Sequence, residues 1–89
     1  MIPTPGRIVE YTLCAQDVDN VKRNRERTGA GGNTVAEGDT YPMVIVRCWG
    51  ATEGSAVNGQ VLLDGNHTLW VTSVSEGDGP RHWRPYPRV

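Results

Sequence analysis

Two cysteines and two histidines are the residues of this 89-residue chain with the widest chemical repertoire. A cysteine nucleophile needs a base beside it and a third group to orient that base, and a zinc ion needs closely spaced pairs of ligands. The four residues are scattered at Cys14, Cys48, His67 and His82, without such spacing. The sequence therefore predicts a protein that is not an enzyme and that holds no metal ion or cofactor.

Basic residues are the second set with a possible chemical role, and they lie in two segments. The first holds Lys22, Arg23, Arg25 and Arg27; the second, residues 81–88, holds Arg81, Arg84 and Arg88 interleaved with Trp83 and Tyr86. Positive charge combined with aromatic side chains is typical of proteins that bind single-stranded nucleic acid. Ten acidic residues balance nine basic ones, however, and the formal net charge is −1. Nucleic acid is therefore the alternative partner and not the first.

Aromatic residues favour a protein partner. The chain has no phenylalanine, so its three tryptophans are the large packing units, and some of them must fill the core. The others are available to line a groove of the kind that binds extended or proline-rich segments. The candidate partner-binding residues are Trp49, Leu62, Trp70, Trp83 and Tyr86.

The elements that position these residues are organised around a predicted β-hairpin at residues 59–74. Two apolar runs flank the sequence D-G-N, which is a strong turn signal. A three-residue loop sets Val61 opposite Leu69, and a five-residue loop sets Leu63 opposite that residue. Both place Val61, Leu63, Leu69 and Val71 on one face, because side chains alternate along a strand. The other face then carries Leu62, Trp70, Thr72 and Val74, which is apolar for a face in water.

The remaining sequence predicts further short strands and one helix. Residues 7–13 and 41–49 are rich in β-branched and aromatic residues, as strands are. Residues 15–27 carry acidic residues early and basic residues late, which suits a short helix. The tail, residues 82–89, can add one short edge strand. The glycine-rich region 28–40 predicts a flexible connection.

These elements predict a mainly β fold. We expect a single domain over residues 1–89, built as a small, partly open SH3-like barrel of four or five short antiparallel strands with one short helix after the first strand. The N-terminus lacks the apolar core of a signal peptide, and no apolar run is long enough to cross a membrane. Two unpaired cysteines suit a reducing compartment. We therefore expect a cytoplasmic protein without a membrane partner.

Four stretches carry a family resemblance that covers nearly the whole chain. They are P-T-P-G-R-I-V-E-Y-T-L, Y-P-M-V-I-V-R-C-W, S-A-V-N-G-Q-V-L-L-D-G-N-H-T-L-W-V-T-S-V and E-G-D-G-P-R-H-W-R-P-Y-P-R-V. In them the chain resembles small proteins encoded by bacteriophages of actinobacteria, such as mycobacteriophages, and by related prophages. The resemblance implies a phage product made in the host bacterial cytoplasm. It would be an accessory protein that binds a host or phage protein, or a minor structural component of the virion. The resemblance carries no catalytic or binding residues over to this chain.

Overall fold

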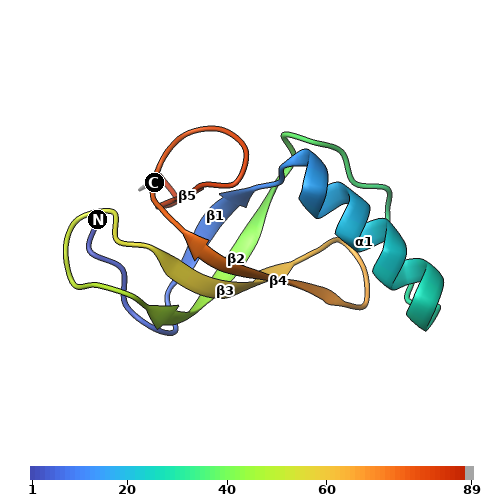
Figure 1. The fold of residues 1–89 in the computed structure, drawn as a ribbon, viewed down its shortest axis with the longest axis horizontal. Coiled ribbons are helices and arrows are strands. Elements are labelled where there is room, and N and C mark those ends of the chain that lie inside the picture. Colours follow the sequence, from blue (N-terminus) through green and yellow to red (C-terminus); the bar gives the residue numbers. More distant parts are fainter. Residues whose placement is uncertain (88–89) are drawn as a thin grey trace.

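The computed structural model describes residues 1–87, and its fold is mainly β (Figure 1). Five antiparallel strands form one open sheet in the order β4-β3-β2-β1-β5. The elements are β1 (Ile8–Thr12), α1 (Ala15–Thr28), β2 (Thr40–Cys48), β3 (Val57–Leu62), β4 (Thr68–Val74) and β5 (Trp83–Arg84). The predicted class, the antiparallel strands and the single helix after the first strand are confirmed. Strand β3 begins at Val57, two residues earlier than the sequence predicted.

The sheet curls until its two ends meet at one point. The segment after β4 reaches β5, where the Trp83 N–H donates to the Ser75 carbonyl at 3.2 Å and the Gly77 N–H donates to the Trp83 carbonyl at 3.0 Å. Glu76 and Trp83 thereby form a parallel bridge outside the named strands. The sheet is closed at this point and open along the rest of β4, as in a partly open barrel.

Trp83 is fully buried at this closure and belongs to the core. It pairs with Tyr11 of β1, whose side chain is also fully buried. Residues directly opposite each other in an antiparallel pair point to the same face, so Trp83 must point inward with Tyr11. The prediction that Trp83 contacts a partner is therefore wrong. In the sequence Trp83 stands in a short proline-flanked tail, and only its long-range pairing with β1 places it in the core.

Strands β3 and β4 form the predicted hairpin in the register of the three-residue loop, with Val61 opposite Leu69. The four residues of the predicted inner face are all buried. Val74 is buried as well, although strict alternation places it on the outer face. A β-bulge adds one residue to β4 at Ser73, whose φ is 53°. The bulge shifts the alternation by one residue, and Val74 turns inward as a result.

Helix α1 is attached to the sheet through a buried polar contact. The Tyr11 hydroxyl donates to Asp17 Oδ2 at 2.6 Å, and the same oxygen accepts the backbone N–H of Cys14, the N-cap residue, at 3.0 Å. Asp17 and Val21 are the buried residues of the helix. The helix ends at Thr28, and the capping residue Gly29 adopts the left-handed conformation with φ of 72°.

The glycine-rich segment after α1 lies against the hairpin turn. The Asn33 backbone N–H donates to the Asp64 carbonyl at 2.8 Å, and Asn33 Nδ2 donates to the Asp64 carboxylate at 2.7 Å. Gly32 pairs with Gly65 so closely that a Cβ on Gly32 would lie 2.6 Å from the Asp64 carbonyl oxygen. Glycine is therefore required at this contact. The predicted flexibility of residues 28–40 concerns motion and stays a prediction.

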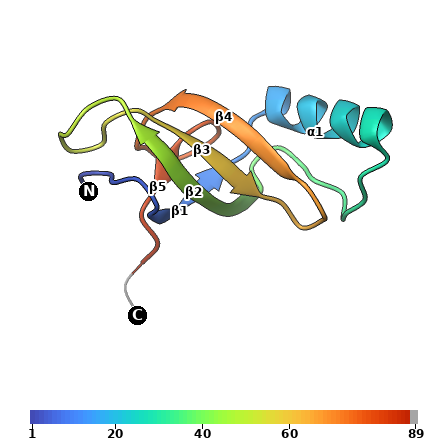
Figure 2. The same ribbon diagram turned by 90° about the horizontal axis from the view of Figure 1, so that it is seen from below.

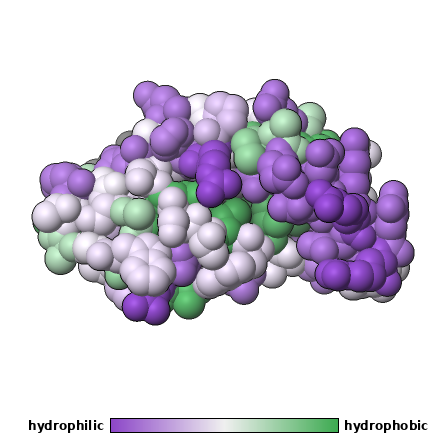
Figure 3. All heavy atoms as spheres, viewed as in Figure 1, coloured by the Kyte–Doolittle hydropathy of each residue, from purple (hydrophilic) through white to green (hydrophobic). Residues whose placement is uncertain are grey.

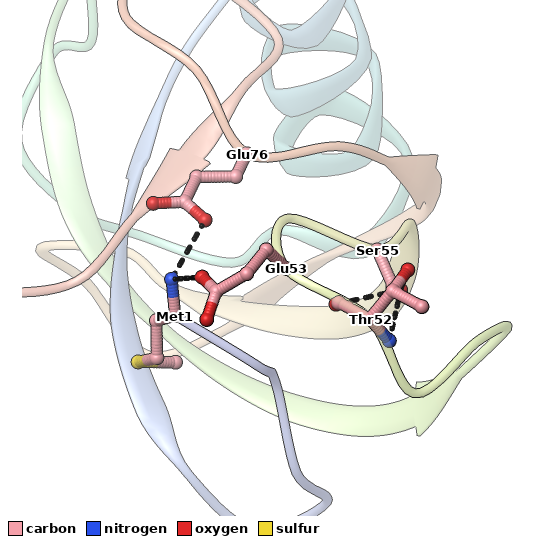
Figure 4. A network of polar contacts seen from close by, with 5 residues as sticks. All are labelled: Met1, Thr52, Glu53, Ser55 and Glu76. Carbon is pink, nitrogen blue, oxygen red and sulfur yellow. Dashed lines mark hydrogen bonds and ion pairs between the residues drawn. The ribbon is translucent and has the colours of Figure 1, made fainter.

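The N-terminal segment lies at the end of the sheet opposite to α1 (Figure 2). The Met1 ammonium group pairs with the carboxylate of Glu53 in the β2–β3 loop and with that of Glu76 in the β4–β5 segment (Figure 4). The distance to Glu76 Oε1 is 3.2 Å. The Met1 carbonyl also accepts the Gly54 N–H at 3.1 Å. Met1 thereby joins two loops that are distant in sequence.

Removal of the Tyr11 hydroxyl tests the attachment of the helix. In Tyr11→Phe the buried Asp17 carboxylate loses a short hydrogen bond, and such bonds to charged groups contribute about 2 kcal/mol. We expect the unfolding free energy, measured by urea denaturation, to fall by about that amount. Tyr86→Phe is the matched control, because Tyr86 is exposed and its loss of a hydroxyl should leave stability unchanged. Equal stability of the two variants would contradict the assigned role of Tyr11.

The pairing of Met1 predicts a pH dependence. The hydrogen bonds that the Met1 ammonium donates to Glu53, and then to Glu76, raise its pKa above the ordinary value of 8.0. A group with a raised folded-state pKa contributes its stability fully below the unfolded value and loses it as the pH rises through the folded value. We therefore expect the unfolding free energy to decline above about pH 8.

The Glu53→Gln/Glu76→Gln double variant is expected to lack this decline, because the pKa of Met1 then returns toward its ordinary value. Urea denaturation of both proteins at a series of pH values from about 7 to about 10 measures the difference. Other groups that titrate in this range are common to both proteins and cancel in the comparison. If the unfolding free energies of the two proteins changed in parallel with pH, the assigned pairing of the Met1 ammonium would be refuted.

Candidate functional site

The outer face of the sheet, turned away from the core, carries one row of side chains across four strands. Ile8 of β1 lies opposite Val44 of β2, Val44 lies opposite Gln60 of β3, and Gln60 lies opposite Trp70 of β4. Trp70 retains 47% of its exposure and Ile8 53%. In the middle of the row, Gln60 Oε1 accepts a hydrogen bond from the Thr68 hydroxyl at 2.8 Å. The row is therefore exposed and apolar at both ends, with a polar centre.

Trp49, which follows β2, lies on the same outer face. Its Nε1–H donates to Asn58 Oδ1 at 2.9 Å, and Asn58 stands two residues before Gln60 on β3, pointing to the same side. The same Asn58 oxygen accepts the backbone N–H of the bulge residue Ser73 at 2.8 Å. The Arg47 guanidinium lies 4.0 Å from the centre of the indole ring of Trp49. Trp49 is thus held on the outer face by a buried asparagine and an arginine.

Together these residues form an exposed apolar surface, which we call the outer apolar surface. Leu62 stands two residues after Gln60 on β3, so it shares this face. Val46 follows the buried Ile45 at a register shift of β2, and its side chain is exposed. The surface consists of Ile8, Val46, Trp49, Leu62 and Trp70. These are five of the seven large hydrophobic residues with the greatest exposure in residues 1–87. Three of the predicted partner-binding residues, Trp49, Leu62 and Trp70, therefore lie on one surface.

The other two predicted partner-binding residues lie elsewhere. Trp83 is in the core, as described above. Tyr86 is 42% exposed, but it follows β5, which stands at the opposite end of the strand order from β4. Burial, followed by the negative charge of Glu10, raises the pKa of the Tyr86 hydroxyl above its ordinary value of 10.0. Tyr86 therefore lies near β1 and β5, at the other end of the strand order from Trp70.

A groove runs between α1 and β4 and encloses a volume of about 450 Å³. Its lining consists of Asn20, Arg23, Asn24, Arg27, Leu69 and Trp70. The four helical residues are spaced i, i+3, i+4 and i+7, which is one face of an α-helix. Arg23 Nη2 donates to Asn20 Oδ1 at 3.4 Å, and Arg27 Nη2 donates to Asn24 Oδ1 at 3.0 Å. In Figure 3 the end of the molecule that carries α1 is strongly hydrophilic, and hydrophobic residues gather nearer the middle of the view.

The predicted nucleic-acid residues are not brought together. Arg23 and Arg27 lie in the groove, whereas Lys22 is exposed outside its lining and the half-buried Arg25 donates to the Asn33 carbonyl at 2.8 Å. Arg81 is exposed in the segment before β5, at a backbone φ of 67°. Arg88 lies outside the described residues.

Arg84 is paired with acidic residues. It binds the carboxylate of Glu10 at 2.7 Å and that of Asp78 at 3.3 Å, and these carboxylates raise the pKa of its guanidinium. Of the predicted nucleic-acid residues within residues 1–87, Arg23 and Arg27 are therefore the two that share a groove with the exposed Trp70.

The cysteines and histidines remain apart. Cys14 caps α1 and Cys48 ends β2, both half-buried as free thiols. His67 lies between β3 and β4, and His82 Nδ1 lies 3.1 Å from the Ser75 carbonyl oxygen. Within residues 1–87 no three histidine, cysteine or acidic side chains gather as metal ligands do. The one helix described there is too short and too polar to span a bilayer.

Sequence reasoning missed the groove. The repeated spacing N-x-x-R-N-x-x-R over residues 20–27 was the available signal, because it places two asparagines and two arginines on one helical face. The same spacing separates two kinds of basic residue. Arg23 and Arg27 line the groove, whereas Lys22 and Arg25 do not.

Comparison of the chain with protein families, with curated proteins and with solved structures found no match to any of them. The class of the protein is therefore defined by its own fold and surface. It is a small, partly open antiparallel β-domain with one helix beside its edge strand and an apolar outer face.

Asn58 is expected to control the position of Trp49. In Asn58→Ala the partly buried N–H of Ser73 and the indole N–H lose their acceptor, which costs about 1–3 kcal/mol of unfolding free energy. We also expect the tryptophan fluorescence of the folded protein to shift toward that of freely solvated indole. Gln60→Ala, two residues along the same face, is the control and should change neither quantity strongly. An unshifted spectrum in Asn58→Ala would contradict the described arrangement.

Proposed function

We propose that this protein is a non-enzymatic binding module that engages another protein through the outer apolar surface. The single observation that carries the proposal is the concentration of exposed Ile8, Val46, Trp49, Leu62 and Trp70 on one face of the sheet. Several exposed hydrophobic residues gathered on one face of a small domain are typical of a protein interaction site. Together with the sequence resemblance, this supports a phage accessory protein whose partner is a host or phage protein.

The composition of the surface supports a protein partner. Tryptophan and arginine are the residues that most often carry binding energy in protein interfaces, and Trp49 with the Arg47 guanidinium over its ring supplies both. Gln60 and Thr68 add polar groups beside Trp70 that are already hydrogen-bonded to each other. Apolar anchor residues beside polar groups whose hydrogen bonds are already made are common in such interfaces.

Nucleic acid is the second candidate, and one observation favours it. Arg23 and Arg27 face the exposed ring of Trp70 across the groove, which combines phosphate-binding and base-stacking groups. The pairing of Arg84 with Glu10 and Asp78 and the net charge of −1 weigh against it. A minor structural role in the virion is the third candidate and would use the free edge of β4 for self-association.

Affinity capture from an actinobacterial host lysate, with and without nuclease, separates these candidates. A partner that survives nuclease and is then purified supports the proposal if it binds through the outer apolar surface. Loss of all captured proteins on nuclease treatment would favour nucleic acid. Detection of the protein by mass spectrometry in purified phage particles would favour the structural role.

Trp70→Ala is expected to weaken binding of the purified partner by about tenfold to a hundredfold, because a central interface tryptophan commonly contributes about 2 kcal/mol. Trp49→Ala should act in the same direction. Tyr86→Ala is the matched control, since it removes an exposed aromatic residue that follows β5, at the other end of the strand order from Trp70. The thermal midpoints of Trp70→Ala and Tyr86→Ala should stay close to that of the parent protein. Unchanged affinity in both tryptophan variants would refute the proposed surface.

A further inference from the structure

The groove beside α1 follows the free edge of the sheet. Strand β4 stands at the end of the strand order and pairs with β3 on one side. Leu69 and Trp70 are consecutive in β4, and consecutive residues of a strand point to opposite faces. Both nevertheless line the groove. A cavity that contacts residues from both faces of a strand lies along its edge, where backbone N–H and C=O groups are available for pairing.

The opposite wall of the groove is a cationic stripe on α1. The stripe consists of Arg23 and Arg27. Each donates a hydrogen bond to the asparagine three residues before it, and these bonds hold the guanidinium groups in place. A guanidinium has five donors, so both arginines keep further N–H groups for a ligand. Like charges one turn apart destabilise a helix, and no acidic residue lines the groove in the part of the chain that the structure describes. The stripe is therefore arranged for an anion that comes from another molecule.

The spacing of the two arginines matches an extended chain. Arg23 and Arg27 are four helical residues apart, which corresponds to about 6 Å along the helix axis. Residues i and i+2 of a β-strand point to the same side and are separated by about 6.8 Å. Two carboxylates at alternate positions of a strand can therefore meet the two guanidinium groups at once. Arginine binds carboxylates in a planar, two-bonded geometry that suits this arrangement.

We propose that the groove binds an extended acidic segment of the partner protein, which adds a strand to the edge of β4 and places carboxylates at positions i and i+2 on Arg23 and Arg27. The inference rests on the proposed function and names the chemistry of the segment that the protein binds. Backbone pairing with β4 supplies affinity, and the two arginines select for acidic side chains. Trp70, at the border between the groove and the outer apolar surface, contacts the same segment.

A defined peptide tests the proposal. The probe is a fluorescently labelled seven-residue peptide with glutamate at its third and fifth positions and threonine or valine elsewhere. One comparison peptide carries glutamine at both positions, and another carries glutamate at the third and fourth positions. Fluorescence anisotropy should show the first peptide binding about tenfold more tightly than either comparison peptide. Amide hydrogen exchange should slow in β4 when the first peptide binds.

Variants of α1 provide the matched comparison. Arg23→Gln and Arg27→Gln should each weaken binding of the peptide with glutamate at its third and fifth positions by about tenfold. Lys22→Gln removes the same charge from a residue outside the groove lining and should leave the affinity unchanged. An equal loss of affinity in all three variants would show that overall charge alone controls binding, and it would overturn the proposal. Equal binding of the glutamine peptide, or binding of a single-stranded oligonucleotide in its place, would also overturn it.

The captured partner distinguishes this inference from the proposed function. If the partner depends on Trp70 or Trp49 but binds the Arg23→Gln/Arg27→Gln double variant as tightly as the parent protein, the acidic-segment inference fails and the binding module stands. If neither tryptophan matters, the proposed function itself fails. Loss of partner binding in the double variant with retention in Lys22→Gln supports both.

Discussion

The hydrogen bond between the Tyr11 hydroxyl and the Asp17 carboxylate sets the position of α1 relative to the sheet. The helix buries only Asp17 and Val21, so few other contacts orient it. Burial and this carboxylate raise the pKa of Tyr11 above its ordinary value, so the hydroxyl remains protonated as a donor. The groove exists because α1 stands beside β4, and its arginine wall therefore depends on one buried contact at the start of the helix.

Local patterns were enough to predict the strands, the helix and the buried face of the hairpin, but they left its loop length open between three and five residues. The alternation of side chains placed Val61 and Leu69 inside correctly, because the pairing of β3 with β4 is regular around these residues. It failed for Val74, because the bulge at Ser73 depends on Asn58, a residue of the neighbouring strand. It also could not place Trp83, whose burial follows from pairing with Tyr11 far earlier in the chain. The errors therefore lie where long-range contacts override local sequence.

The candidate site was predicted in part for the same reason. Residues on adjacent strands of one hairpin share a face by simple alternation, so Leu62 and Trp70 were found together. The groove combines a helix and an edge strand from different parts of the chain, and no local pattern reports that contact. The spacing of Arg23 and Arg27 was visible, but its meaning required knowing that Trp70 lies opposite.

The closure of the sheet at β5 has a consequence for the order of folding. The closure requires β5 to pair with β1 as well, and Arg84 and Glu10, which pair between these two strands, are 74 positions apart in the chain. Strands β2, β3 and β4 follow one another with short connections, so their pairing loses little chain entropy. The three-stranded meander can therefore form early, whereas the barrel closes in a slower step of high contact order. Most residues of the outer apolar surface belong to this meander, so that face forms before Trp83 is buried in the core.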